Sequence, residues 1–90
     1  MPMKYFAKVL LISNRYKLFN YNIEEFIKRL KELRKEKGLT QIQLAKATNL
    51  SDTAISYWEN GQRIPNALAI IALAKFFDVT TDYLLGVSEI

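Results

Sequence analysis

Helix-capping signals recur at short intervals along this chain, and they constrain its fold more than any other feature of the sequence. A side chain that can accept a backbone hydrogen bond stands before each apolar stretch, and apolar staple residues flank most of these caps. The caps are Asn22, Thr40, Ser51, Asn66 and Thr80, and Glu25 and Gln43 complete capping boxes with the first two. They predict helices over residues 23–37, 41–48, 52–60, 67–77 and 81–85, and therefore an all-α fold.

The first 21 residues have a different pattern. Segments 5–12 and 16–21 are rich in the aromatic and aliphatic residues that favour strands, and residues 13–15 between them could turn. We predict an N-terminal extension over residues 1–21 that forms a β-hairpin, with an extra helix or a partly disordered dimerisation arm as alternatives. Because 90 residues suffice for one core, residues 22–87 are predicted to form a single domain.

The composition excludes most enzymatic chemistry. The chain has no cysteine and no histidine, which removes thiolate nucleophiles, the usual zinc sites and Ser-His-Asp catalysis. There is no glycine-rich phosphate loop, and Asp52 and Glu59 stand about 10 Å apart along one predicted helix. We therefore expect a protein that is not an enzyme and that uses no cofactor and no metal.

The net charge of +4 is carried by one end of the chain. Residues 1–22 contain four bases and no acid, so the remainder is neutral and the charge alone is weak evidence for a nucleic-acid partner. The longest apolar run, residues 67–74, is far shorter than the roughly 20 residues that a bilayer requires. No signal peptide is apparent, and we expect a cytoplasmic protein.

Residues 40–59 have the pattern of two short helices joined by a tight turn. Ala45 is small where the helices would cross closely, and Asn49 stands where the turn needs a residue that tolerates positive φ. The apolar residues that let both helices share one core are Leu44, Leu50, Ile55 and Trp58. This is a helix-turn-helix pattern.

A longer set of residues has the order and spacing of a known family. The set is Arg34, Gly38-Leu39-Thr40-Gln41, Leu44-Ala45, Leu50-Ser51, Ile55-Ser56, Trp58-Glu59-Asn60-Gly61, Pro65, Leu73-Ala74, Val79 and Leu84-Leu85-Gly86. Over about residues 23–87 the chain resembles the lambda repressor-like helix-turn-helix domain of the Cro/XRE family. The resemblance implies a five-helix domain that binds DNA, usually as a dimer in transcriptional regulation.

The resemblance also implies roles for particular residues. Base readout falls on Asp52, Thr53, Ser56 and Tyr57, near the start of the helix that enters the major groove. Phosphate contacts fall on Gln41 and on the loop residues Asn60, Gly61, Gln62 and Arg63. Arg34 and Glu59 occupy positions that pair, which would tie the first helix to the end of the reading helix. An ordinary solvated helix face is the alternative for the reading positions.

Asp52 is unusual for a base-reading position, because a carboxylate is repelled by nearby phosphates. It could accept a hydrogen bond from cytosine N4. It also stands in the first turn of its helix, where a negative charge interacts favourably with the helix dipole. We rank the helix-dipole role slightly ahead of direct readout.

The helix predicted over residues 67–77 is apolar nearly all round. Its predicted core residues are Ile70, Ile71, Leu73, Ala74 and Phe77, and a second stripe consists of Leu68, Ala69, Ala72 and Phe76. A helix that is apolar on all sides is buried on all sides. We therefore expect Leu68, Ala72 and Phe76 to be covered by a second copy of the chain or by the first 21 residues.

Together these features predict a small prokaryotic or phage-type transcriptional regulator. The leading hypothesis is a repressor that binds a palindromic double-stranded DNA operator as a homodimer, with no membrane partner. Two other functions stay open: an antitoxin that binds both DNA and a toxin, and a protein-interaction module that has lost its DNA affinity. The neutral body of the chain and Asp52 favour the interaction module.

Overall fold

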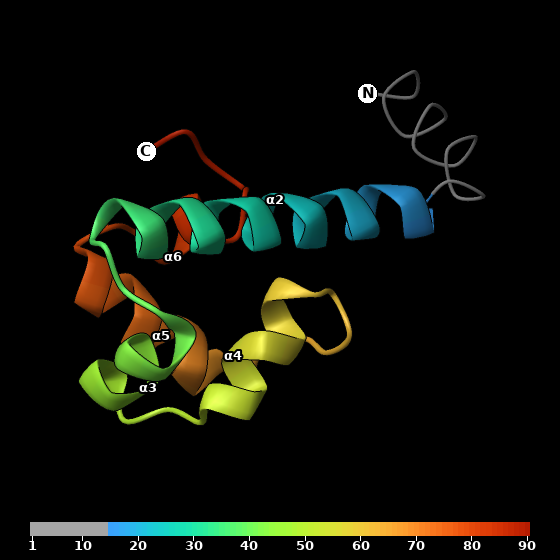
Figure 1. Ribbon diagram of the computed structural model, residues 1–90. Coiled ribbons are helices and arrows are strands. Elements are labelled where there is room, and N and C mark those ends of the chain that lie inside the picture. Colours follow the sequence, from blue (N-terminus) through green and yellow to red (C-terminus); the bar gives the residue numbers. More distant parts are fainter. Residues whose placement is uncertain (1–14) are drawn as a thin grey trace, which may run out of the picture.

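The computed structural model describes the backbone of residues 15–90 and the side chains of residues 23–90. The helices in this range are α2 (Arg15–Glu36), α3 (Gln41–Thr48), α4 (Asp52–Glu59), α5 (Ala67–Phe77) and α6 (Thr81–Leu84), shown in Figure 1. Residues 15–90 contain no strand. The predicted all-α, five-helix fold is confirmed for this part of the chain.

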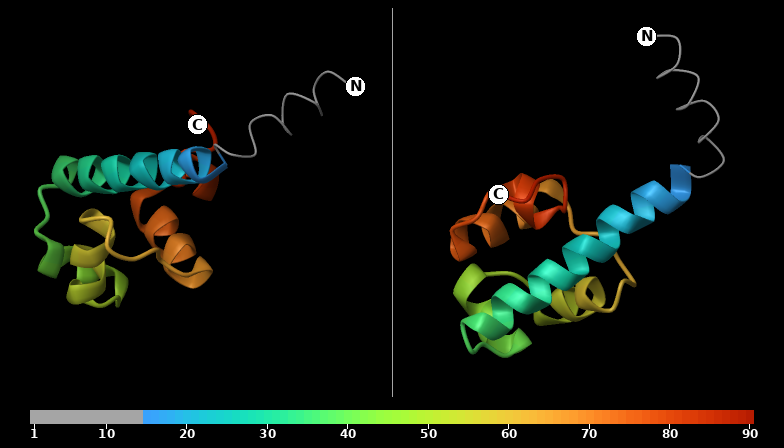
Figure 2. Two further views of the ribbon diagram at one scale, coloured as in Figure 1. Left: turned by 90° about the vertical axis from the view of Figure 1, so that its right-hand side faces the viewer. Right: turned by 90° about the horizontal axis from the view of Figure 1, so that it is seen from above.

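The long helix α2 lies across one side of the domain, with α3, α4 and α5 packed beneath it (Figures 1 and 2). It contacts α4 and α6, while α3 contacts α4 and α5. Each helix contributes one fully buried aliphatic side chain to the centre: Leu30, Leu44, Ile55, Leu73 and Leu84. Because all five helices meet in one core, the orientation of each depends on the others.

Four of the predicted caps are present. The side chains of Thr40, Ser51, Asn66 and Thr80 each accept a backbone hydrogen bond at the start of α3, α4, α5 and α6 respectively. Thr40 and Gln43 form the full reciprocal capping box. These helices begin where the sequence predicts, and their ends lie within one residue of the predicted ends.

The prediction for the start of the first helix is wrong. Residues 16–21, predicted as the second strand of a hairpin, belong to α2, and Asn22 lies inside this helix rather than capping it. Residues 15–36 contain no proline and no glycine, and asparagine and aromatic residues disfavour a helix too weakly to stop it. The first predicted strand, residues 5–12, lies outside the described residues.

The two faces of α5 also differ from the prediction. Ala69, which is predicted to lie in the outer stripe, is buried, and Ile71, which is predicted to lie in the core, is 43% exposed. Of the predicted interface residues, Leu68 is 76% exposed, whereas Ala72 and Phe76 are half-buried. An apolar pattern that runs all round a helix does not indicate which face packs inward, and the small Ala69 permits close approach.

Within residues 15–90, no helix is both long enough and apolar enough to span a membrane. The same part of the chain contains no group of three or more acidic side chains placed to hold a metal ion. Every buried side-chain nitrogen and oxygen in the described part has a hydrogen-bond partner. The buried polar side chains of this part are therefore paired within the chain.

Candidate nucleic-acid interface

Helices α3 and α4 form the predicted helix-turn-helix. Asn49 follows α3 in the left-handed conformation (φ 59°), and this allows the backbone N–H of Leu50 to bond the Ala45 carbonyl at 3.0 Å. Ser51 then caps α4 by accepting a hydrogen bond from the Ala54 N–H at 3.2 Å. Ala45 is buried, as expected for a small residue between crossing helices. The turn therefore has the geometry that the sequence predicts.

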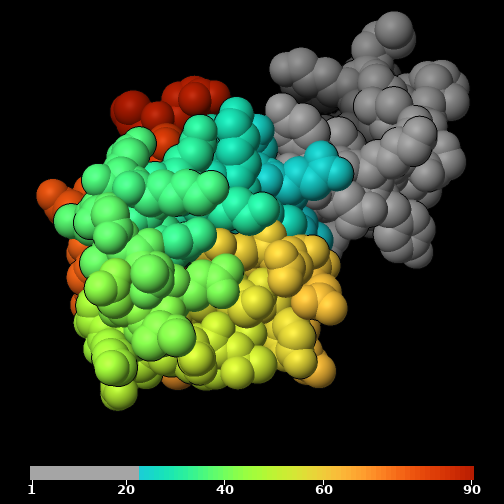
Figure 3. Space-filling view, viewed as in Figure 1, coloured from blue at the N-terminus to red at the C-terminus, as the bar shows by residue number. Residues whose placement is uncertain are grey.

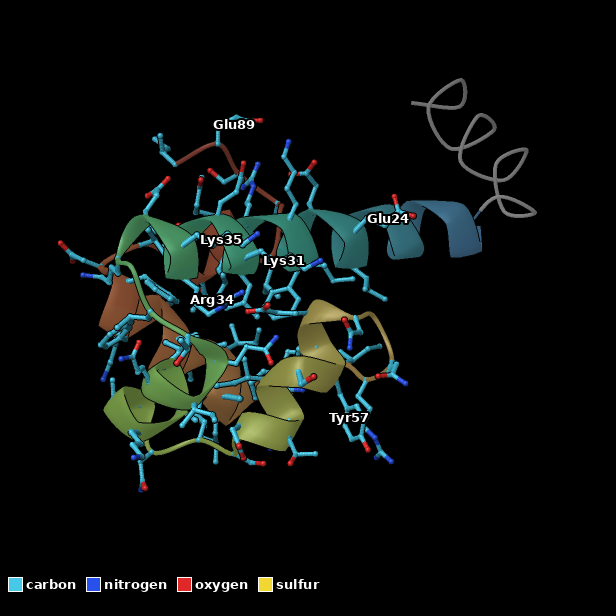
Figure 4. All side chains as sticks on the ribbon, viewed as in Figure 1. Glu24, Lys31, Arg34, Lys35, Tyr57 and Glu89 are labelled. Carbon is cyan, nitrogen blue, oxygen red and sulfur yellow. The ribbon has the colours of Figure 1, made fainter. Side chains whose placement is uncertain are left out.

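Helix α4 has one buried face and one accessible face. Ile55, Trp58 and Glu59 are buried against the body of the domain. The four predicted reading residues lie on the other face: Asp52 and Thr53 are exposed, and Ser56 and Tyr57 are half-buried. In Figure 4, Tyr57 points away from α2 at the outer side of α4. The structure thus brings the four residues onto one surface.

The carboxylate of Asp52 is engaged with its own helix. Its Oδ1 accepts a hydrogen bond from the backbone N–H of Thr53 at 2.9 Å. This N–H belongs to the first turn of α4, where backbone donors lack partners within the helix. The contact favours the helix-supporting role that we ranked first for Asp52.

The predicted pair of Arg34 and Glu59 is present. Arg34 Nε donates to Glu59 Oε2 at 2.7 Å, and Arg34 Nη2 donates to Glu59 Oε1 at 2.9 Å, so the contact is bidentate. Arg34 also donates to the carbonyl of Leu39 in the loop before α3. The hydrogen bonds to the Glu59 carboxylate raise the pKa of Arg34. Figure 4 shows Arg34 on the side of α2 that faces α4.

Gln41 joins this ion pair. Its Nε2 donates to Glu59 Oε1 at 3.0 Å, which ties the first residue of α3 to the last residue of α4. A side-chain amide has two N–H donors, so one remains for another acceptor. The family resemblance implies a phosphate contact for Gln41, but it gives no sign that Glu59 orients this side chain.

The predicted phosphate loop begins with a tight reversal of the chain. Gly61, at φ 74°, donates to the Trp58 carbonyl, and Gln62 donates to the Tyr57 carbonyl at 2.9 Å. This pattern is a Schellman motif, which requires a left-handed residue and favours glycine. A Cβ at Gly61 would lie 3.2 Å from Ile27 Cδ1 of α2. The loop is therefore hydrogen-bonded to α4 and passes close to α2.

The predicted reading residues and phosphate-contacting residues lie together. Gln41 is bonded to Glu59, and the loop residues Asn60, Gly61, Gln62 and Arg63 follow Glu59 directly and are exposed. In the space-filling view, α3, α4 and the loop after α4 form one continuous surface below α2 (Figure 3). Polar side chains and one arginine are thus arranged around the accessible face of α4.

Sequence reasoning missed the buried side chain of Arg29 on α2. Arg29 is 8% exposed, donates to the carbonyls of Tyr83 and Ser88, and stacks on the Tyr83 ring with its Cζ 4.3 Å from the centroid. Glu25 and Glu89 lie within ion-pair distance. This contact holds the C-terminal tail, residues 85–90, against α2. The sequence contains one sign of this burial: Arg29 stands within the apolar stripe of Phe26, Leu30 and Leu33.

An apolar surface lies beside the loop after α4. Ile64 is 61% exposed and is followed by the exposed Leu68 and Ile71 of α5. A pocket of about 210 Å³ opens between α2, this loop, α5 and the tail. Its lining residues are Ile23, Phe26, Arg63, Ile64, Pro65, Ile70 and Leu85. Apart from Arg63, the lining is apolar.

Comparison with known proteins agrees with this geometry. A family model described as helix-turn-helix matches residues 30–84. The transcriptional activator BcrR of Enterococcus faecalis is 47% identical over 66 residues, which is 73% of this chain and 32% of BcrR. Repressor protein C2 of Salmonella phage P22 is 37% identical over 57 residues, 63% of this chain and 26% of the repressor.

A solved structure covers a similar part of the chain. The restriction-modification controller protein C.AhdI from Aeromonas hydrophila is 34% identical, with a TM-score of 0.64, over 71% of this chain and 97% of that one. By contrast, the chain spans a third to a half of the length of the regulators BcrR and ImmR. The similarity thus covers only part of these longer regulators.

Proposed function

Because the chain belongs to the helix-turn-helix family of Cro/C1-type regulators, we propose that it binds double-stranded DNA in a sequence-specific manner and regulates transcription. The observation that supports this most directly is the division of α4 into a buried face and a polar accessible face. The proposed protein is a DNA-binding regulator rather than an enzyme. We propose that the protein is cytoplasmic, since bacterial and phage DNA lies in the cytoplasm.

The accessible face of α4 is proposed to read bases in the major groove. Thr53 and Ser56 offer hydroxyl groups that both donate and accept, and the Thr53 methyl group can contact a thymine methyl. The hydroxyl of Tyr57 extends this set toward the end of the helix. Asp52 is proposed to support the start of α4, because its carboxylate already accepts the Thr53 N–H.

Phosphate contacts are proposed on both sides of this face. Gln41 has one amide hydrogen left after its bond to Glu59, and it stands at the start of α3, where unpaired backbone donors favour an anion. Asn60, Gln62 and Arg63 supply further donors from the exposed loop, and the backbone of Gly61 shapes it. These contacts would fix the orientation of α4 on the duplex.

We further propose that the protein acts as a repressor. A domain that occupies an operator can exclude the transcription machinery by occupancy alone, whereas activation needs an additional productive contact. The relatives include a named activator and a named phage repressor, so similarity alone does not choose between them. Occupying the operator requires only the DNA-binding surface, and this favours repression.

The oligomeric state is proposed to be a homodimer that binds a palindromic operator. The exposed Ile64, Leu68 and Ile71 form an apolar surface beside the proposed DNA contacts, with the half-buried Ala72 and Phe76 further along α5. A two-fold axis there would present two α4 helices to half-sites about 34 Å apart. Leu68→Lys should convert the dimer to a monomer in analytical ultracentrifugation. A monomeric wild-type chain would contradict this part of the proposal.

The test of DNA recognition is selection of bound sequences from a random duplex pool, followed by titration. Thr53→Ala and Ser56→Ala should each weaken binding to the selected operator by about 1–3 kcal/mol and leave binding to random DNA nearly unchanged. Thr81→Ala, the same change in the first turn of α6, is the matched control. No enriched sequence and no binding at low salt would refute the proposal and favour a protein-interaction module.

A further inference from the structure

The guanidinium group of Arg63 lies against the ring of Tyr57. The Cζ atom of Arg63 is 5.3 Å from the ring centroid, within the range of a cation–π contact. Tyr57 is half-buried on α4, whereas Arg63 is exposed in the following loop. Tyr57, which is proposed to read bases, is thus in contact with Arg63, which is proposed to contact a phosphate.

The reversal of the chain after α4 creates this contact. The Gly61 and Gln62 N–H groups bond the carbonyls of Trp58 and Tyr57, so the backbone turns back at the end of the helix. Ile27 of α2 fills the space beside Gly61, with its Cδ1 only 3.2 Å from where a Cβ would stand. The two hydrogen bonds hold the loop backbone against α4, and Arg63 lies beside the last turn of this helix.

The guanidinium group of Arg63 forms no ion pair with the other described side chains. Among residues 23–90, no acidic side chain forms an ion pair with it, whereas Arg29 and Arg34 are both paired. A free arginine side chain samples many rotamers, and ordering it on binding lowers the affinity. Contact with an aromatic face restricts the arginine rotamers before DNA binds. The N–H donors at the edge of the guanidinium plane stay available.

We propose that Tyr57 is a positioning residue for Arg63: its ring holds the guanidinium group at the edge of the α4 surface for a DNA phosphate. This inference rests on the proposed function and deepens it. It gives the ring of Tyr57 a role that does not depend on base sequence, while the hydroxyl stays available for a base edge.

The test is fluorescence anisotropy with a labelled random-sequence duplex, at salt concentrations from about 50 to 200 mM. The variants are Tyr57→Leu, Tyr57→Phe, Arg63→Ala and the double variant Tyr57→Leu/Arg63→Ala, each checked for folding by circular dichroism. Tyr57→Leu should weaken random-DNA binding about 2- to 5-fold, the range expected for an exposed cation–π contact. Tyr57→Phe keeps the ring, so its loss of random-DNA binding should be clearly smaller than that of Tyr57→Leu.

Arg63→Ala should weaken binding and reduce the salt slope by about 0.9 for one lost phosphate contact. In that background Tyr57→Leu should have no further effect on random DNA. A measurement without DNA accompanies these titrations: the ring current of Tyr57 should move the Arg63 δ-proton resonances upfield, and Tyr57→Leu should abolish this shift.

Three results would overturn the inference while the proposed function stands: unchanged random-DNA binding by Tyr57→Leu, an equal loss in both Arg63 backgrounds, or a loss in Tyr57→Phe as large as in Tyr57→Leu. The first result would leave Tyr57 as a base-reading residue only. If the wild-type chain does not bind the duplex at any salt concentration tested, the proposed function and this inference both fail.

Discussion

Replacing Glu59 by glutamine should remove a large part of the stability of this domain. The Glu59 carboxylate is 2% exposed and accepts two hydrogen bonds from Arg34 and one from Gln41. In Glu59→Gln the new amide group can accept hydrogen bonds only at its oxygen. Its NH2 group would face the N–H donors of Arg34 or Gln41. Arg34, whose side chain is 13% exposed, would lose the bidentate contact and its charged partner, and would keep the Leu39 carbonyl and at most one hydrogen bond to the new amide oxygen.

Burial decides the expected magnitude. A solvent-exposed ion pair contributes about 0–1 kcal/mol, but removal of one partner from a buried pair costs about 3–5 kcal/mol, because the remaining charge is uncompensated. Total stability for a domain of this size is roughly 0.05–0.15 kcal/mol per residue. Glu59→Gln should therefore destabilise the fold severely, and partial unfolding at room temperature is expected.

Urea unfolding followed by circular dichroism measures the effect, with Glu32→Gln as the matched control. Glu32 is an exposed carboxylate on α2, so its loss should change the free energy of unfolding by less than about 0.5 kcal/mol. The double variant Arg34→Met/Glu59→Leu should recover most of the loss, because no buried charge remains unpaired. A cost below about 1 kcal/mol for Glu59→Gln would refute the reasoning.

The pH dependence of this pair follows from Arg34. The raised pKa of its guanidinium means that this contribution to stability is fully present below the ordinary arginine pKa and is lost only as pH rises through the folded-state value. Between about pH 7 and pH 9, the contribution of Arg34 to the wild-type stability should therefore stay constant. A wild-type free energy of unfolding that falls steeply over this interval would contradict that expectation.

Three further predictions concern single positions. Asp52→Asn should keep the selected operator sequence and tighten binding to all DNA, because a repulsive charge is lost while the helix start keeps an acceptor; a changed base preference in a repeated selection would show that Asp52 reads a base. Gly61→Ala should cost more than the roughly 1–2 kcal/mol of left-handed strain, because of Ile27, whereas Gly38→Ala, with open space around its Cβ, should cost the strain alone in the same urea assay. Arg29→Gln should lower the free energy of unfolding by about 1–3 kcal/mol, because the hydrogen bonds to the carbonyls of Tyr83 and Ser88 are lost. Near-wild-type stability would show that these hydrogen bonds do not stabilise the domain.

The range of the interactions explains which features could be predicted from the sequence. The caps at Thr40, Ser51, Asn66 and Thr80 join residues three apart, so the local sequence contains both partners. The start of α2 could not be predicted in the same way, because the apparent cap at Asn22 is followed by a good helix and preceded by no residue that stops one.

Contacts between distant segments were predicted only where a family resemblance supplied them. Arg34 and Glu59 are 25 residues apart and were paired by resemblance alone. The Tyr57–Arg63 stack depends on a reversal whose direction is set by Gly61, and the contacts of Arg29 reach residues more than 50 positions away. No periodicity or capping signal carries that information.

The contacts of Arg29 with Tyr83, Ser88 and Glu89, here called the Arg29 clamp, limit where a fusion junction can be placed when this domain is moved into a chimeric regulator. The family match ends at residue 84, yet the Ser88 carbonyl and the Glu89 carboxylate still contact Arg29. Figure 4 shows Glu89 on the side of α2 that faces away from α4. A junction placed after residue 84 would leave a buried guanidinium short of partners, whereas a junction after residue 90 would preserve the clamp and attach the new module on the side of α2 opposite α4.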